Sequence, residues 1–162
     1  MSDFIDIQET ISIARRGMSA GPCQRDSKRT EAALPAGVLV VTGSTEYSCK
    51  VPAATGQITA SGFALGITEF QTAKEPDPAA TNEYLINEIA TIVTKGRVWM
   101  ITEGSPTVGA PVFIRFASGG GGSQLGAARI DADTGTAVGL PSGVFRSTAT
   151  NGVALVEINL PQ

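Results

Sequence analysis

The chain has 162 residues, a mass of 16.6 kDa and a formal net charge of −3, which suits one domain with a real hydrophobic core. Hydrophobic residues make up 42% of the chain and charged residues only 17%, which excludes a disordered protein. The pI near 4.9 argues against broad affinity for nucleic acid, because such binding depends on many Lys and Arg contacts to phosphates.

Residues 1–34 differ from the rest of the chain and are predicted to form an extended N-terminal arm. Gly, Ser, Pro and charged residues fill most of 15–34, as in an irregular connection. Apolar residues in 1–16 fit either a strand or one face of a helix, and their β-branched content favours extended structure. We expect the arm to be poorly ordered in the free protein, and its removal to leave a folded domain.

Positive charge gathers in residues 11–29, which hold five basic residues against Asp26 alone: Arg15, Arg16, Arg25, Lys28 and Arg29. Two interpretations stay open. The segment either meets an acidic partner or is a solvated tail with scattered charge.

Residues 35–162 are predicted to form one domain of short strands separated by turn residues. The alternation of apolar and polar residues gives each strand one apolar face, and such strands bury those faces by closing into a barrel or packing as two sheets. The sequence therefore predicts an all-β fold, a small β-barrel or sandwich of about nine short strands. The candidate strands are 37–42, 46–51, 62–70, 84–94, 97–103, 111–117, 125–131, 143–147 and 152–160.

Two further segments are predicted to be exposed turns or loops. One is residues 54–62, and the other is the glycine run 119–122 between two of the candidate strands. No apolar run approaches the ~20 residues of a transmembrane helix, and the N-terminal residues do not read as a signal peptide. We therefore expect no membrane partner.

The residues that carry most enzyme chemistry are absent or isolated. Histidine does not occur, which removes the commonest general base and metal ligand. Cys23 and Cys49 lack the spacing of a zinc or redox site, and we expect free thiols. Asp131 and Asp133 resemble the start of a cation loop, but too few oxygen ligands follow, so a surface turn with Gly135 is favoured. The sequence predicts no enzyme activity, no cofactor and no metal.

Residues 95–116, KGRVWMITEGSPTVGAPVFIRF, resemble the half-barrel motif of biotinyl and lipoyl carrier domains. Such a carrier needs a lysine at an exposed hairpin tip. The lysines of this chain, Lys28, Lys50, Lys74 and Lys95, have no such setting. The motif therefore indicates barrel geometry, and a carrier domain is the weakest of the open alternatives.

A longer series of features carries a second resemblance. A Gly-x-Val-Trp strand is followed by a PVFIRF strand that ends in a glycine loop, by a short GAARID strand, by a Leu-Pro turn before a Phe strand, and by a closing VEINLP strand. This order resembles the structural cement, or head decoration, proteins of tailed bacteriophages. The likeness covers residues 35–162 well, and residues 1–34 more loosely.

The resemblance implies a structural role in a virion. Such proteins look like compact β domains that join as trimers outside an expanded capsid and bridge neighbouring coat subunits, often with an N-terminal arm across the shell. For this chain it implies three things: binding to the major capsid (coat) protein, a homotrimer, and a place on the capsid surface after assembly in the host cytoplasm. It implies no direct contact with nucleic acid.

Arg15, Arg16, Gly17 and Met18 are the candidate capsid contacts. A tail or fibre domain of a virion is the main alternative function.

Overall fold

The structure, a computed structural model, describes residues 15–59, 63–71, 82–118 and 123–160. It is almost entirely β, which confirms the predicted fold class. The elements of the described part are β1 (Gln24–Thr30), β2 (Leu34–Pro35), β3 (Leu39–Thr42), β4 (Ser48–Lys50), α1 (Gly56–Thr59), β5 (Ala64–Thr68), β6 (Glu83–Tyr84), β7 (Ile89–Glu103), β8 (Pro111–Arg115), β9 (Ala128–Arg129), the 3₁₀ turn η3 (Asp133–Gly135), β10 (Ala137–Phe145) and β11 (Val153–Asn159).

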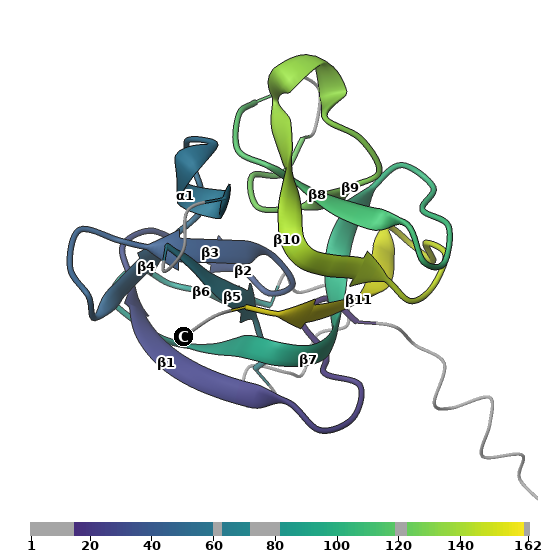
Figure 1. Cartoon of the computed structure of the whole chain (residues 1–162). Helices are drawn as coiled ribbons and strands as arrows, with labels where there is room; N and C mark the ends of the chain where they lie inside the picture. The colour runs from purple at the N-terminus through teal and green to yellow at the C-terminus, as the bar shows by residue number, and fades with distance from the viewer. Residues whose placement is uncertain (1–14, 60–62, 72–81, 119–122, 161–162) are drawn as a thin grey trace, which may run out of the picture.

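Strand β7 is the longest strand and belongs to two closed rings of strands (Figure 1). Its first half pairs with β1 and β5, and the order β1-β4-β3-β5-β7 closes a five-stranded barrel, called the first ring below. Its second half pairs with β11 and β9, and the order β7-β11-β10-β8-β9 closes the second ring. Closure buries the apolar face of each one-faced strand and limits exposed edges.

Two groups of buried side chains fill the structure. The smaller group includes Val40, Cys49 and Ile92 from strands of the first ring and Tyr84 from β6. The larger group fills the second ring and the space between the rings, with members from β3, β5, β7, β8, β9, β10 and β11. Apolar and polar residues alternate along the strands because successive side chains point to opposite faces, and those that point away from the core remain free to be polar.

The predicted division of residues 84–103 into two strands is wrong. Tyr84 belongs to β6, while residues 89–103 form one continuous strand that passes through the expected turn at Gly96. Gly96 has a φ of +130°, and a Cβ there would lie 2.6 Å from the Cys23 Sγ atom. Glycine therefore lets the chain around Cys23 approach β7 where the strand passes from one ring to the other.

The prediction of an irregular connection over 15–34 is wrong for β1. Residues Gln24–Thr30 pair antiparallel with β7 over most of their length, and Arg29 and Thr30 also pair with β4. Thr30 alone in this strand is buried, so β1 is held by backbone pairing and lacks the apolar alternation that reveals a strand in a sequence. Removing residues 1–34 would take away a barrel strand, contrary to the expectation that the domain would stay intact.

The predicted turn at 54–62 is also partly wrong. Residues Gly56–Thr59 form α1, and Ile58 is 2% exposed and joins the larger core group. The glycine run 119–122 and residues 1–14 lie outside the described residues, so the loop and the strand or helix expected there stay predictions.

A carboxylate at the end of β1 holds the connection between β3 and β4. The Glu31 Oε1 atom accepts hydrogen bonds from the Ser44 backbone N–H, from the Ser44 hydroxyl at 2.5 Å and from the Ser48 hydroxyl at 2.6 Å. The bonds from Ser44, then that from Ser48, lower the pKa of Glu31 to about 2. The connection includes the exposed Tyr47.

We expect the Glu31 carboxyl to remain ionised in the folded protein until the pH falls to about 2. Because the folded pKa lies below the unfolded value of ~4.3, this group stabilises the fold above pH ~4.3 and loses that contribution as the pH falls through the folded pKa. Carboxyl chemical shifts followed by NMR measure it, and Ser44→Ala should raise the titration midpoint. A midpoint of ~4.3 in the unaltered protein would contradict the described hydrogen bonds.

Candidate surfaces for binding

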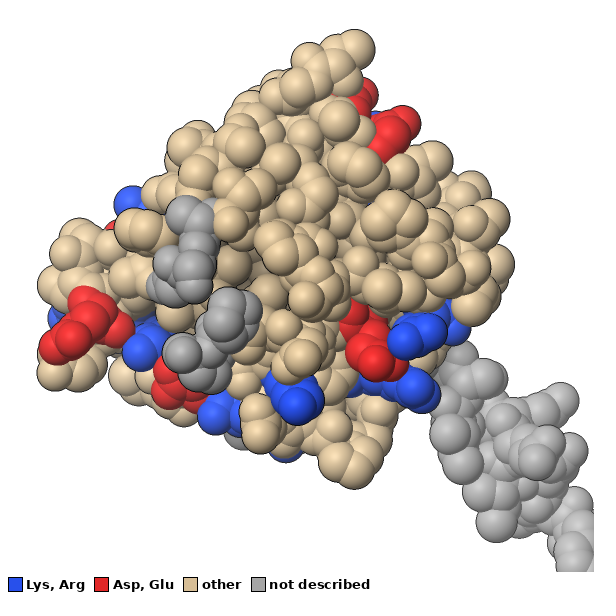
Figure 2. All heavy atoms as spheres, in the orientation of Figure 1, with Lys and Arg blue, Asp and Glu red and all other residues tan. Residues whose placement is uncertain are grey.

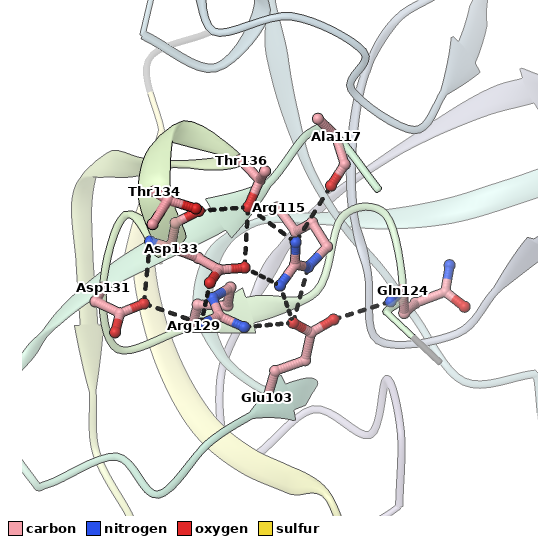
Figure 3. A network of polar contacts seen from close by, with 9 residues as sticks. All are labelled: Glu103, Arg115, Ala117, Gln124, Arg129, Asp131, Asp133, Thr134 and Thr136. Atoms are coloured by element: carbon pink, nitrogen blue, oxygen red, sulfur yellow. Dashed lines mark hydrogen bonds and ion pairs between the residues drawn. The ribbon is translucent and has the colours of Figure 1, made fainter. Parts of the chain in front are cut away.

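A network of charged side chains fixes the far end of β7 (Figure 3). The Arg115 guanidinium, in a residue 2% exposed, donates from Nε to the Glu103 carboxylate at 2.8 Å and from Nη2 to Asp133 at 2.7 Å. Arg129 donates to the same Glu103 oxygen at 2.8 Å. These four residues come from β8, β7, η3 and β9, so the network joins three strands of the second ring to the turn that follows them.

The network also includes residues that precede and follow the glycine run 119–122 in the sequence. The Gln124 backbone N–H donates to Glu103 at 2.9 Å, and Arg115 donates to the Ala117 carbonyl at 3.3 Å and to the Thr136 hydroxyl at 3.0 Å. Burial raises the pKa of Glu103, but the hydrogen bonds from the two arginines outweigh burial and hold that pKa below its ordinary value. The network is therefore a structural clamp.

The cation-loop alternative for Asp131 and Asp133 finds no support in this geometry. Asp133 binds Arg115, Asp131 binds Arg129 at 3.0 Å, and Gly135 takes the positive φ of +90° expected of the turn. Both carboxylates are thus engaged by guanidinium groups. Within the described ranges, no group of three or more His, Cys, Asp or Glu side chains is placed to hold a metal ion.

The N-terminal segment is attached to the barrel at Gly17. Its N–H donates to the Trp99 carbonyl at 2.7 Å, and its own carbonyl accepts from the Phe70 N–H at 2.9 Å. Gly17 has a φ of +75°, and a Cβ there would lie 2.7 Å from backbone atoms of Phe70 and Thr68. The position therefore requires glycine for both its conformation and its space.

The four candidate capsid contacts from the sequence have different positions. Gly17 is buried, and the Met18 carbonyl accepts from the Trp99 N–H at 2.9 Å. The Arg15 guanidinium lies over the Phe70 ring, 5.8 Å from its centroid. Arg16 is the exposed member of the four. Arg16 is thus the side chain of this set that is most available to a partner.

Charge is unevenly distributed over the surface. Figure 2 shows that the area over α1 and β10 is almost free of charged side chains, while Lys and Arg gather toward the side of β1 and β7. The residues of α1 and β10 carry no charge. Phe63, which follows α1, is 50% exposed, and Val108, in the loop that bonds to the end of β10, is 64% exposed. Depletion of charge is typical of the centre of a protein interface.

Further exposed apolar side chains lie around the end of β1. Tyr47, Leu85, Ile86 and Ile89 are 72%, 57%, 61% and 62% exposed. They surround the end of β1, since Arg29 pairs with Ile89, its N–H donates to the Tyr47 carbonyl, and the Thr30 hydroxyl donates to the Leu85 carbonyl. The sequence analysis missed this group, because its members come from two segments that only the fold brings together.

The described lysines do not match a carrier site. Lys95 lies inside β7, Lys50 ends β4, and Lys28 donates to the Glu46 carbonyl at 3.0 Å. Lys74 lies outside the described residues. Cys23 and Cys49 are free thiols, and burial raises the pKa of Cys49 to about 11. No helix in the described part of the chain is long and apolar enough to cross a membrane.

Two solved structures are similar in fold to this chain, to different degrees. Its fold is similar to a chain in the capsid of Myoviridae phage XM1, with a TM-score of 0.72, 17% identity, and coverage of 90% of this chain and 89% of the other. A weaker likeness, with a TM-score of 0.43 and 14% identity over 87% of this chain and 98% of the other, is to the N base of the head fibre gp8.5 of bacteriophage phi29. No curated protein sequence matches.

The family match decides the identity. Residues 7–160 match the structural cement proteins, the family described by E217 gp24 and Pam3 gp6. This range includes every strand of both rings and part of the segment before Arg15. Structural cement proteins are non-enzymatic parts of the phage capsid, which agrees with the lack of catalytic residues in the sequence. The chain therefore belongs to the phage structural cement protein family and is a structural component of the virion capsid.

Proposed function

We propose that the protein decorates the outside of the expanded phage head as trimers, bridges neighbouring copies of the major capsid protein and stabilises the shell against the pressure of packaged DNA. The observation that carries the proposal is the family match over residues 7–160. Three weak contacts held by one trimer act with a high effective concentration, so modest individual contacts suffice for firm attachment.

The proposed coat contact lies where the N-terminal segment leaves the barrel, at Arg15, Arg16, Gly17 and Met18. Gly17 is hydrogen-bonded to Trp99 and Phe70. A coat contact made by the exposed Arg16 would therefore hold the folded domain, and not only the N-terminal segment, on the shell. We place the start of the domain near Arg15 and not at residue 35, because β1 belongs to the barrel. Residues 1–14 would then form the arm over the shell.

The proposed trimer contact is the uncharged surface over α1 and β10. Its exposed apolar residues, Phe63 and Val108, are suited to burial against a neighbouring subunit. A trimer requires two different patches on each subunit, since a three-fold axis generates heterologous contacts. Reconstruction of a decorated particle would show whether three copies meet at this surface.

Removal of residues 1–14 is the decisive test of the coat contact. We expect the chain of residues 15–162 to keep its thermal unfolding, because both rings remain intact, but to bind undecorated expanded heads roughly 100-fold more weakly, because each trimer loses three contacts together. Co-sedimentation with heads measures binding, and parallel sedimentation with isolated tails tests the alternative of a tail component. Equal binding by the full and shortened chains would show that the barrel surface alone makes the contact.

A charge reversal tests the contribution of Arg16 to head binding separately from that of residues 1–14. We expect Arg16→Glu to weaken head binding, and the salt dependence of the remaining binding to flatten, because exposed charge pairs are screened over about 10 Å at ~0.1 M ionic strength. Lys95→Glu, an equal charge change at an exposed position inside β7, is the matched control. The same loss in both variants would mean that net charge, and not Arg16, governs binding.

A further inference from the structure

The only tryptophan of the chain, Trp99, belongs to neither group of buried side chains. Its neighbours in β7, Val98 and Met100, are buried in the larger group, so strand alternation turns Trp99 to the opposite face of the sheet. Trp99 is half-buried there, and Arg97, two residues earlier on the same face, is exposed. Tryptophan is among the residues most enriched where proteins bind one another.

Trp99 is the centre of an apolar row that crosses three neighbouring segments. The bridge between Ser19 and Val98 places Met18 opposite Trp99 on one side, where the Trp99 N–H donates to the Met18 carbonyl at 2.9 Å. Leu155 of β11 lies opposite Trp99 on the other side. Met18 and Leu155 are both half-buried. The row therefore begins at one of the candidate capsid contacts and continues over the outside of the second ring.

Two exposed arginines beside the row share one carboxylate. The Nε atoms of Arg97 and Arg146 donate to the same Glu157 oxygen at 2.8 and 3.0 Å, and their side chains are 54% and 40% exposed. The Arg146 N–H donates to the Leu155 carbonyl, which places this arginine next to the apolar row. Among the described residues, neither guanidinium makes a further hydrogen bond, so the terminal nitrogens of both are available to bind a carboxylate.

The chemistry of this face fits an acidic protein surface. An apolar centre that contains Trp and Met and is bordered by Arg is typical of a protein interface. The uncharged surface over α1 and β10 offers the arginines no carboxylate, and contact of this face with the same face of a second copy would bring like charges together. The row also continues directly from Arg16 and Met18, the proposed coat contact, so a coat subunit is the occupant that fits.

We propose that the face formed by Met18, Trp99, Leu155, Arg97 and Arg146, called the Trp99 face below, binds the major capsid protein where an exposed carboxylate lies beside apolar side chains. In this contact Trp99 packs against the apolar side chains, and the terminal nitrogens of the two arginines bind the carboxylate. The inference rests on the proposed function for its partner, and it extends the coat contact from the N-terminal segment to the outside of the second ring.

Removal of apolar side chains tests the centre of the face. Threonine suits a strand, and thermal unfolding checks the fold of each variant. We expect Trp99→Thr to weaken binding to undecorated expanded heads by roughly 30-fold, the loss of one interface hot spot, and Leu155→Thr to weaken it by about 5-fold. Tyr47→Thr, which removes another exposed aromatic ring, is the control and should bind normally.

The outcome of these variants decides the role of the apolar row. Unchanged binding by folded Trp99→Thr and Leu155→Thr would overturn the proposal, as would an equal loss in Tyr47→Thr. If Trp99→Thr does not fold, Leu155→Thr alone decides.

Neutralising Glu157 tests the charge of the partner. Glu157→Gln frees both arginines for the coat carboxylate, so it should tighten head binding by about 2-fold and make it more sensitive to salt. Arg97→Gln combined with Arg146→Gln should weaken binding by about 2- to 5-fold. Glu46→Gln, an equal charge change at another exposed acid, is the control and should have no effect. Weaker binding by Glu157→Gln would overturn the proposal of an acidic partner.

Hydroxyl-radical footprinting of the full chain shows whether the face is covered on the head. Oxidation of Trp99 should fall when the protein is bound to expanded heads, relative to the free protein. A change in the sedimentation of free Trp99→Thr would mean that a second copy covers the face, which would overturn the coat as occupant. If the unaltered protein does not bind heads, the proposed function fails as well, whereas head binding with Trp99 fully oxidisable overturns this inference alone.

Discussion

Replacing Arg115 by alanine should lower the free energy of unfolding by about 3 kcal/mol, near the lower end of the range for breaking a buried ion pair. The guanidinium, with a side chain 3% exposed, holds Glu103 and Asp133 at 2.7 Å, and its loss removes their link across β7, β8 and η3. Arg129 still neutralises Glu103, which keeps the cost from being larger. Denaturant unfolding followed by fluorescence or circular dichroism measures it.

The pH dependence provides a second measurement on the same variant. Because the folded pKa of Glu103 lies below its ordinary value, this carboxylate stabilises the fold above its unfolded pKa of ~4.3 and loses that effect as the pH falls through the folded pKa. The difference in stability between the unaltered protein and Arg115→Ala should therefore shrink in acid.

The control for Arg115→Ala is Arg97→Ala. Arg97 binds Glu157 at the surface with a side chain 54% exposed, and Arg146 binds the same carboxylate. We expect the unfolding midpoint to change little in this variant, since exposed ion pairs contribute little. Equal losses from Arg115→Ala and Arg97→Ala would show that the buried clamp has no special role.

Replacing Gly17 by alanine should destabilise the protein by about 2–5 kcal/mol. A left-handed backbone costs a residue with a Cβ about 1–2 kcal/mol, and forcing atoms into a filled space adds about 1–3 kcal/mol. Here the added methyl group would meet backbone atoms of Phe70 and Thr68 at 2.7 Å, which a side-chain rotation cannot relieve. Thermal unfolding monitored by circular dichroism measures the loss.

Gly21→Ala separates the two causes. Gly21 has a φ of +96°, but a Cβ there would meet no atom within 4 Å, so this variant bears only the conformational cost of about 1–2 kcal/mol. Gly17→Ala should therefore be clearly the less stable of the two. If the two variants unfold together, the N-terminal segment is not packed against the barrel as described.

The sequence alone determined the fold class and the position of most strands. Alternation in residues 152–160 and β-branched runs such as 37–42 mark one-faced strands, and one-faced strands have few ways to bury their apolar side other than closure or stacking. The same local logic favoured a surface turn at Asp133 over a cation loop and excluded histidine chemistry. The order of motifs from Gly96 to Leu160 was enough to identify the family.

Only the tertiary structure revealed that β1 belongs to the first ring. Strand β1 has mostly exposed side chains and a mixed charge, so no hydrophobic pattern distinguishes it from a loop, and only its backbone hydrogen bonds to β7 hold it in the barrel. Gly96 shows the converse case. A glycine that is typical of a turn lies within a continuous strand because the chain at Cys23 must pass close to it.

For the candidate surfaces, too, some residues could be found from the sequence and others only from the fold. The resemblance to cement proteins made Arg15 to Met18 the candidate capsid contacts, and the fold left Arg16 exposed while it buried Gly17. The apolar group of Tyr47 and Ile89 and the clamp around Arg115 had no signal in the sequence, since their members are far apart along the chain and each is ordinary by itself. Pairing across strands creates such sites, because the register of the rings, and not local sequence, determines which side chains become neighbours.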